Sequence, residues 1–255
     1  MAVVLVEKRT AHLTVLTLNR PERRNALSLQ LLNELISAIK MASDQAEERI
    51  LILRGAGAAF CTGLDLKEAS DHNKAHATAD LVAQALITLS QTRLVTIAAV
   101  HGAAVAGGAG LMSACDYVVA AAKTKIGYPE VRRGLVAGLV MTFLRRQLRE
   151  RDIRELLLGS DLIDAERARE MGLVNKVVAT EADAMADAEA FANRVLQGAP
   201  GALQQTKRLI EEFWGRSVTS DIELALKHHM QARTSSEARE GIAAFNEKRL
   251  PNWVK

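Results

Sequence analysis

A cluster of glycines in the middle of the chain is the part of the sequence best suited to chemistry. The apolar and partly β-branched run Thr96–Val100 is typical of a buried strand, and a segment of glycine and alanine follows it. Where a strand gives way to a helix, the first N–H groups of the helix have no partner, and small residues let a ligand approach them. Such a junction can stabilise a developing negative charge. The glycines are Gly102, Gly107, Gly108 and Gly110.

One carboxylate, Glu130, follows this segment after a Gly-Tyr-Pro turn. A pocket of N–H donors beside a carboxylate is the minimal equipment for moving a proton next to a carbonyl group. The structural alternative is a solvated turn carboxylate, or one paired with Arg132 or Arg133. On these residues alone both interpretations stay open.

A second small-residue loop repeats the arrangement earlier in the chain. Ile50–Leu53 is a short apolar run that predicts a buried strand, and the loop at residues 55–66 carries Gly55, Gly57 and Gly63. The chain therefore places two glycine loops after two buried strands.

Strands and helices alternate through most of the chain, and helices alone follow Glu181. This order predicts an α/β core at residues 1–195 and a C-terminal helical region at residues 196–255. A polar stretch at residues 69–78 has no apolar period, so we expect a mobile loop over a site there, with a helix beginning at Asp80. The other expected elements are a hairpin of Val3–Val6 and His12–Leu18, helices at 29–42, 137–148, 151–158 and 165–171, and a strand at 173–178.

Composition limits the classes of function. The chain has 255 residues, 49% of them hydrophobic, and a formal net charge of +3 with the basic residues dispersed, so we expect no nucleic acid partner. No apolar run reaches transmembrane length and the N-terminus lacks a signal-peptide pattern. Cys61 and Cys115 stand in apolar surroundings, which favours small core residues in a reducing compartment, and hence a cytoplasmic protein.

Six stretches of the sequence, taken together and in order, resemble the crotonase superfamily, also called the enoyl-CoA hydratase/isomerase family. They include N-R-P-E-R-R-N-A-L, A-F-C-T-G-L-D-L and A-V-H-G-A-A-V-A-G-G-A-G-L-M-S-A-C-D. Because the stretches span nearly the whole chain, the resemblance is far more specific than any single motif. Their positions are Asn19–Leu27, Ala59–Leu66, Ala99–Asp116, Pro129–Gly134, Ala168–Val178 and Phe245–Pro251.

The resemblance implies a spiral of ββα units with a C-terminal helical trimerisation region, assembled as a homotrimer or a dimer of trimers. It implies an acyl-CoA thioester as substrate, with coenzyme A part of that substrate, no separate cofactor and no metal. By position, the N–H groups of Leu64 and Gly107 would form the oxyanion hole, and Glu130 would be catalytic. The resemblance also implies substrate contacts for Ala26, Thr62 and Leu66 around the adenine, and for Lys67 and Lys248 at the phosphates, Lys248 across a subunit boundary.

The sequence departs from the family's hydratases at one catalytic position. Those hydratases carry two glutamates, and the first position is occupied here by Gly110. A single glutamate beside an oxyanion hole suffices to move a proton from C2 to C4 of an enoyl thioester. The pattern therefore leans towards an isomerase, or a hydratase whose second acid comes from elsewhere, such as Glu68 or Asp71. We count Gly110 among the substrate-binding positions, where it would either allow close packing or leave room for a bulkier acyl chain.

Other functions stay open at this stage. Decarboxylases and thioester hydrolases belong to the same superfamily, and a non-catalytic acyl-CoA binder, or an RNA binder using the arginines at 145–151, is the alternative outside catalysis. Gly108, Gly110 and Glu130 also lie at roughly the spacing of a dinucleotide-binding pattern. Asp116 and a new strand follow too soon for the long crossover helix that such a site needs, which argues against it.

Overall fold

A twisted sheet runs through the molecule and sets the position of every other element. The structure, a computed structural model, describes residues 2–69, 72–215 and 217–254. The sheet has the strand order β1-β2-β3-β4-β6-β9, antiparallel between β1 and β2 and parallel from β2 onward. The strands are β1 Val4–Thr10, β2 Leu13–Leu18, β3 Ile50–Gly55, β4 Val95–Val100, β6 Tyr117–Ala121 and β9 Lys176–Val178.

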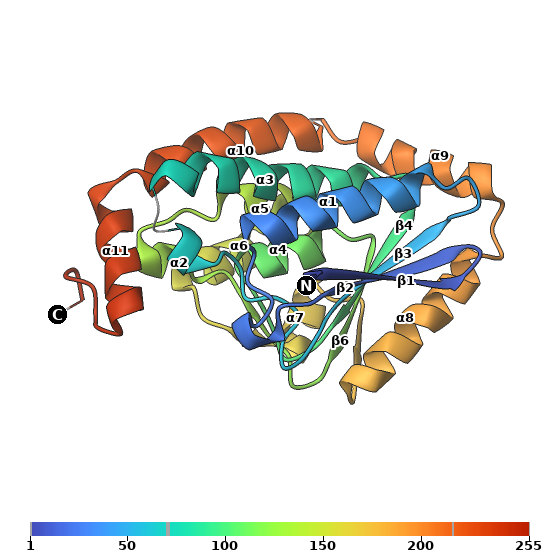
Figure 1. Cartoon of the computed structure of the whole chain (residues 1–255), viewed down its shortest axis with the longest axis horizontal. Coiled ribbons are helices and arrows are strands. Elements are labelled where there is room, and N and C mark those ends of the chain that lie inside the picture. The colour runs from blue at the N-terminus through green and yellow to red at the C-terminus, as the bar shows by residue number, and fades with distance from the viewer. Residues whose placement is uncertain (1, 70–71, 216, 255) are drawn as a thin grey trace.

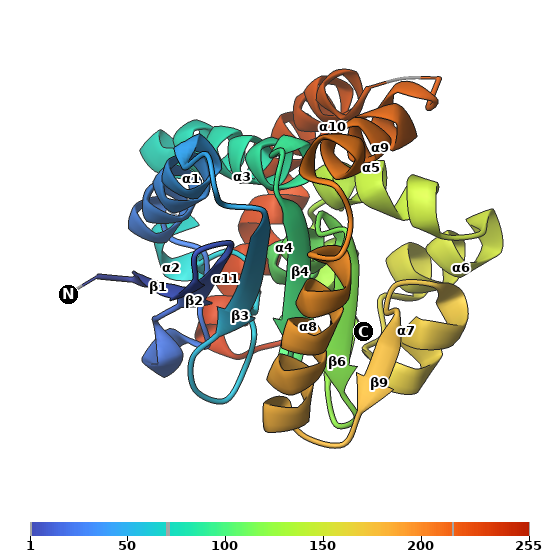
Figure 2. The same cartoon turned by 90° about the vertical axis from the view of Figure 1, so that its right-hand side faces the viewer.

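Successive side chains along each strand point to opposite faces of this sheet. In β3, Ile50 and Ile52 pack under α8, Glu181–Val195, whereas Leu51 and Leu53 face the opposite layer, which contains α1, Leu29–Asp44. Both faces are covered by helices, so the parallel strands are continuous apolar runs. Figures 1 and 2 show α8 on one side of the sheet and α1 and α3 on the other.

The parallel part of the fold repeats one unit, a long strand, a short strand and a helix. Strand β4 is followed by β5, Ala103–Val105, and α4, Gly107–Ser113. Strand β6 is followed by β7, Lys125–Gly127, a 3-10 helix at Pro129–Arg133, and α5. The short strands form a second sheet in the order β5-β7-β8, and Cys61 joins it through a bridge to Ala104. The seven-residue α4 leaves no long crossover helix, as the sequence indicated against a dinucleotide site.

Helices complete the structure around these sheets. Ser28 caps α1 by accepting from the Leu31 N–H at 3.2 Å, as its sequence predicts, and Asp164 and Gly172 begin and end α7. The predicted helix at 151–158 is divided into α6 and a π-helical turn, η3, that follows. The remaining bounds are η1 Pro21–Arg23, α2 Leu66–Ala69, α3 His72–Gln91, α5 Gly138–Gln147, α6 Glu150–Arg154, η3 Glu155–Gly159, β8 Ile163–Asp164 and α7 Ala165–Met171.

The C-terminal segment is helical, as predicted. It consists of α9, Pro200–Glu212, α10, Val218–Arg233, and α11, Ser236–Glu247. Helix α10 lies along α3 and α5, while α11 stands at the end of the molecule against the 3-10 helix at 129–133 (Figure 1). The division of the chain into a core and a helical region at residue 195 stays a prediction.

The expected mobile loop at residues 69–78 is wrong for the part that the structure describes. Helix α3 begins at His72, eight residues before the predicted start at Asp80. His76 and Ala77 are exposed while Thr78 and Ala79 are buried, so the helix is already partly packed before the predicted start at Asp80. Residues 70 and 71 lie outside the described part of the chain.

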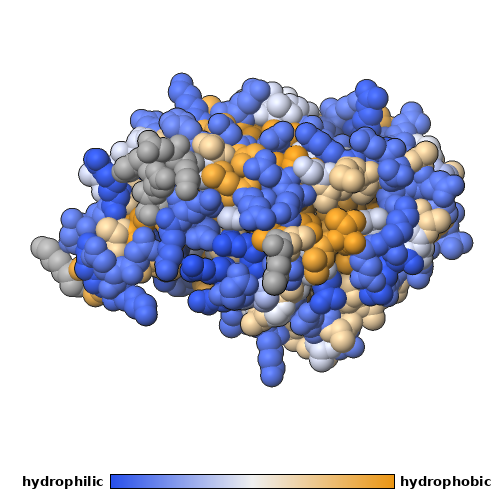
Figure 3. All heavy atoms as spheres, viewed as in Figure 1, coloured by the Kyte–Doolittle hydropathy of each residue, from blue (hydrophilic) through white to orange (hydrophobic). Residues whose placement is uncertain are grey.

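The surface mixes polar and apolar side chains, and apolar ones gather near the middle of the face in Figure 3. Strand β1 is an edge strand whose Leu5 and Val6 are 45% and 61% exposed.

Cys61 and Cys115 are buried and unoxidised, and burial raises the pKa of the Cys61 thiol to about 12. Within the described ranges, no helix is long and apolar enough to cross a membrane.

Candidate active site

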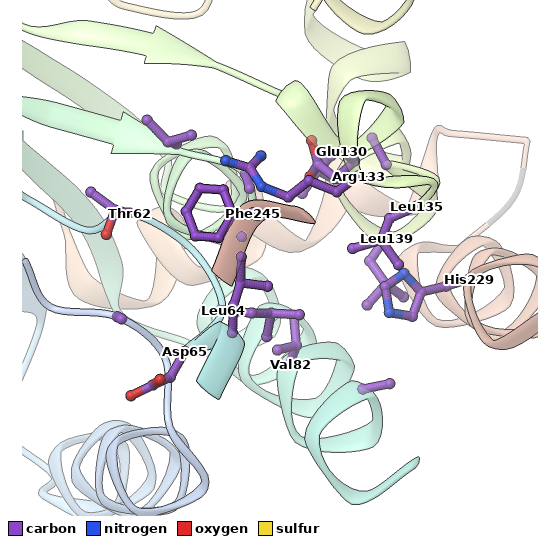
Figure 4. A pocket seen from close by; sticks show the side chains of 18 of the residues that line it. Thr62, Leu64, Asp65, Val82, Glu130, Arg133, Leu135, Leu139, His229 and Phe245 are labelled. Atoms are coloured by element: carbon purple, nitrogen blue, oxygen red, sulfur yellow. The ribbon is translucent and has the colours of Figure 1, made fainter. Parts of the chain in front are cut away.

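A cavity of about 500 Å³ lies where the two glycine loops, the 3-10 helix at 129–133, α5, α10 and α11 converge (Figure 4). Its lining is mainly apolar, and it includes the charged residues of the 22–24 and 65–67 segments. Most residues that the sequence proposed for the site line this one cavity. They are Ala26, Thr62, Leu64, Leu66, Lys67, Gly107 and Glu130.

The backbone around Leu64 turns its N–H group towards the cavity. Leu27 brackets Leu64 in a parallel bridge, donating its N–H to the Gly63 carbonyl at 2.8 Å and accepting from the Asp65 N–H at 3.0 Å. In such a bridge the N–H of the middle residue points away from the bracketing strand. Leu64 lines the cavity on that opposite side, and its N–H donates to no described acceptor.

Gly107 supplies a second N–H beside the first. It is the first residue of α4, so its N–H lacks an intrahelical acceptor, and no other described residue accepts from it. The preceding Ala106 has φ of 52° and ψ of −125°, a rare conformation for alanine, and donates to the Gly127 carbonyl at 2.8 Å. Ala106 thereby fixes the direction in which Gly107 presents its N–H.

Glu130 lines the cavity, and one oxygen of its carboxylate has no partner in the described part of the chain. Its Oε2 is buried and has no hydrogen-bond partner among the described residues. Burial raises the pKa of Glu130 to about 7, against the lowering effect of the backbone and of the Arg133 charge. The expectation of a solvated turn carboxylate is therefore excluded. A carboxylate with a pKa near neutrality can accept and return a proton at physiological pH.

Arg133 is the charged neighbour of Glu130. Its Nη1 donates to the Pro129 carbonyl at 3.2 Å, and its guanidinium lies 4.5 Å from the centre of the Phe245 ring (Figure 4). Burial lowers the pKa of Arg133, whose charge Glu130 supports. Arg132 turns away and pairs with Asp161. Phe245 of α11 thus closes the cavity over Arg133.

Two other described acids, Glu22 and Asp65, line the cavity with Glu130, and neither was a candidate for the second acid. Glu68, one of the two candidates, accepts from the Leu29 N–H at 3.0 Å and caps α1, and it does not line the cavity. Asp71, the other candidate, lies outside the described residues. Asp65 lines the cavity but forms an ion pair with Arg20 at 2.9 Å. Glu130 is therefore the best-placed acid/base.

Gly110 does not line the cavity, although the sequence placed it among the substrate contacts. A methyl group on Gly110 would lie 2.6 Å from Val140 Cγ1 of α5, so the space is already filled. Of the two interpretations, the structure favours close packing between α4 and α5 over extra room for an acyl chain. Lys248, the exposed C-cap of α11 with φ of 56°, is also absent from the lining.

Sequence analysis did not identify several lining residues, among them Phe245 and His229. Phe245 was noticed only as part of a terminal motif, and His229 was not considered at all. His229 stands on α10, a helix of modest amphipathicity, so its spacing does not reveal that it faces a cavity formed with α5. A neighbouring histidine, His228, is exposed, and sequence alone gives no reason to choose between them.

Comparison with known proteins identifies the family. Residues 8–255 match the family model described as enoyl-CoA hydratase/isomerase. A Thermus thermophilus protein named "Putative enoyl-CoA hydratase" is 36% identical, and the match covers 98% of this chain and 100% of that protein. The mevalonyl-coenzyme A hydratase of Aspergillus fumigatus is 33% identical and covers 98% of this chain and 94% of its own.

The same family appears among solved structures. An enoyl-CoA hydratase from Mycobacterium avium is 31% identical, covers 99% of both chains and superposes with a TM-score of 0.86. The fold, with paired N–H groups and a buried carboxylate in one cavity, is that of a crotonase-type enzyme. The chain belongs to the enoyl-CoA hydratase/isomerase family, and the fold predicted from its motifs is confirmed.

Proposed function

We propose that this protein isomerises 3-enoyl-CoA thioesters to 2-enoyl-CoA thioesters, with Glu130 as its proton carrier. The observation that carries the proposal is a carboxylate whose buried Oε2 has no partner among the described residues, in the same cavity as two backbone N–H groups that donate to no described acceptor. Family membership supports the thioester substrate, and the glycine at position 110 supports the choice of isomerisation.

The proposed reaction balances with one acid/base. The Glu130 carboxylate removes a proton from C2, and the electron pair delocalises through the C3–C4 double bond and onto the thioester oxygen. The Leu64 and Gly107 N–H groups stabilise that oxygen, each by roughly 3 kcal/mol in a preorganised site. Protonated Glu130 then delivers its proton to C4, and the double bond moves to C2–C3. No water is consumed.

The mouth of the cavity suits the coenzyme A part of the substrate. Ala26, Thr62 and Leu66 provide backbone around the adenine in this proposal, and Lys67 meets a phosphate. The ion pair between Arg20 and Asp65 braces the loops that carry these residues. Lys248 would contribute across a subunit boundary of a homotrimer or a dimer of trimers. A cytoplasmic location and the absence of a separate cofactor belong to the same proposal.

Hydration is the second candidate, because relatives are named as hydratases. Water addition normally needs a second acid, which Asp71 would have to supply. A binding-only protein or an RNA binder is less well supported. In the arginine-rich helices, Arg146 pairs with Glu211, and Arg149 lies 2.7 Å from Asp152, so these charges are engaged within the chain.

The test is incubation with a 3-enoyl-CoA and, separately, with crotonyl-CoA in deuterated water, following mass and thioester absorbance. Isomerisation predicts conversion of the 3-enoyl ester and no hydration of crotonyl-CoA. Because Glu130 returns the proton that it removed, little deuterium should enter the product in a single turnover. Glu130→Gln should bind the ester and lose conversion. Hydration of crotonyl-CoA at a comparable rate would replace the proposal with the hydratase, and full conversion by the Gln variant would remove Glu130 from its role.

A further inference from the structure

The apolar end of the cavity contains one imidazole. His229 projects from α10 beside Leu139, and the wall around it is built from Val82 and Leu135 as well (Figure 4). The whole residue is only 7% exposed. A polar ring on an otherwise aliphatic wall, away from the thioester-binding loops, calls for a partner because burial removes its contacts with water.

The hydrogen bonding of His229 decides which chemical group it can receive. Its Nδ1 lies 3.4 Å from the Val136 carbonyl oxygen, which can only accept, so Nδ1 carries the proton. Burial and the positive charge of Arg233 lower the pKa of His229, which keeps the ring neutral at physiological pH. A neutral imidazole protonated at Nδ1 presents Nε2 as a lone-pair acceptor.

That acceptor has no partner within the described chain. Nε2 is buried and makes no hydrogen bond there, although His229 lines the cavity. Buried acceptors are almost always satisfied, and one that faces a ligand cavity is satisfied by the ligand. The complementary ligand group must be a donor. Carboxylate and ketone groups are acceptors only, and they would meet the lone pair unfavourably.

We propose that His229 Nε2 accepts a hydrogen bond from a hydroxyl group on the distal part of the acyl chain, so that the preferred substrates are hydroxylated enoyl-CoA thioesters. This inference rests on the proposed function, because it assumes that the acyl chain enters this cavity. It assigns His229 to specificity and not to the chemical step. The aliphatic residues around the ring bind the methylene groups, and the single acceptor selects the hydroxylated chain.

The kinetic test compares matched substrates. The 3-enoyl-CoA esters with a hydroxyl on carbon 5, 6, 7 or 8 are each measured against the deoxy ester of the same length. At one position the wild-type enzyme should prefer the hydroxylated ester at least about tenfold in kcat/KM, mainly through KM, as expected for binding energy shared by ground and transition states. Equal kcat/KM values at all positions would overturn the proposal.

Two variants separate acceptor chemistry from packing. His229→Leu removes the acceptor and should bring the kcat/KM values of the hydroxylated and deoxy esters to the same level, whatever its effect on the rate with either ester. His229→Gln restores a carbonyl acceptor and should recover part of the preference. A preference unchanged in His229→Leu would assign the selection to another group and overturn the role of His229. The comparison of hydroxylated and deoxy esters with the wild-type enzyme needs no variant, so it can still refute the proposal if a variant fails to fold.

A binding measurement distinguishes this inference from the proposed function. Calorimetry with saturated hydroxyacyl-CoA and acyl-CoA pairs of the same lengths requires no turnover. Tighter binding of one hydroxylated ester without any isomerisation of enoyl esters would support the His229 site and refute the isomerase. Isomerisation of enoyl esters, together with equal affinity for both members of every pair, would support the isomerase and refute the His229 site.

Discussion

Gly63 and Ala106 hold the two glycine loops in contact at the centre of the site. A methyl group added to Gly63 would lie 2.9 Å from Ala106 Cβ and 3.0 Å from the Val105 carbonyl oxygen. Gly63 also has φ of +84°, a region that side chains disfavour. The spacing between the Leu64 and Gly107 N–H groups therefore depends on a glycine that sits between them without contributing a side chain.

Gly63→Ala should impair catalysis by separating these loops. Loss of one oxyanion donor lowers kcat by about 10²–10³-fold, and we expect a fall of that order with a smaller change in KM. The measurement is steady-state kinetics on a 3-enoyl-CoA, with circular dichroism as the check on folding. The control is Gly201→Ala, where an added methyl group meets nothing within 4 Å. Equal kcat values for the two variants would contradict the prediction.

Activity should follow the ionisation of Glu130. Proton abstraction needs the carboxylate, and burial raises its pKa to about 7. In the free enzyme, kcat/KM should therefore rise with pH and level off above about pH 7. A rate profile already flat from pH 5 upward would show that the acting base has an ordinary carboxyl pKa and is not Glu130 in this environment.

The contribution of Glu130 to folding stability should fall as the pH rises, whereas the activity should increase. The pKa of Glu130 is raised from 4.5 to about 7 on folding, so the folded state holds the proton more tightly than the unfolded chain. Its stability contribution is complete below pH 4.5 and lost as the pH rises through about 7. The Glu130→Gln variant has no carboxyl group to ionise at this position, so it does not lose this stability as the pH rises. Relative to wild type, the Gln variant should gain about 3 kcal/mol in unfolding free energy between pH 4.5 and 8.

Urea unfolding of both proteins across that pH range measures the difference directly. Taking the difference cancels the contributions of the other titratable groups, which the two proteins share. An unfolding free energy difference that does not vary with pH would mean that Glu130 has the same pKa in the folded and unfolded states.

Sequence patterns predicted the elements whose local chemistry is self-contained. The apolar period of α1 and its cap at Ser28, the buried strand β3, and α7 with Asp164 and Gly172 at its ends all lie where expected. Each depends on residues within a few positions of one another. The three site residues proposed from the motifs likewise line a single cavity; they are Leu64, Gly107 and Glu130.

What the sequence could not predict depends on contacts between distant elements. The first turns of α3 resemble a loop because His76 and Ala77 face solvent, so tertiary placement and not amphipathicity keeps them helical. Gly110 and Val140 are thirty positions apart, and only the packing of α4 on α5 reveals why the glycine is needed. The same holds for His229, whose exposure differs from that of His228 through the position of α10 alone.

Helix α11 should influence the site through the backbone it touches. A methyl group on Gly241 would lie 2.5 Å from the Arg133 carbonyl carbon, in the 3-10 helix that carries Glu130. Gly241→Ala should displace α11 or this short helix and lower kcat by about tenfold or more, since a misplacement of 1 Å can cost 10²-fold. Intrinsic Phe and Trp fluorescence and kinetics on one preparation provide the check. Wild-type kcat in a folded variant would show that Glu130 is positioned independently of α11.

The close packing at Gly110 predicts a compensating pair of substitutions. Gly110→Ala should improve helix propensity by about 1 kcal/mol, yet the added methyl group would sit 2.6 Å from Val140 Cγ1 on a stiff, buried side chain. Overpacking of this kind costs about 1–3 kcal/mol, so the single variant should be destabilised or at best neutral. Val140→Ala alone leaves a small void. Combined, the two substitutions should be more stable than the sum of their separate effects, with a coupling of about 1 kcal/mol in a double-mutant cycle by urea unfolding. Additive effects would show that α4 and α5 can move apart freely, and Gly110 would then have no packing reason to be glycine.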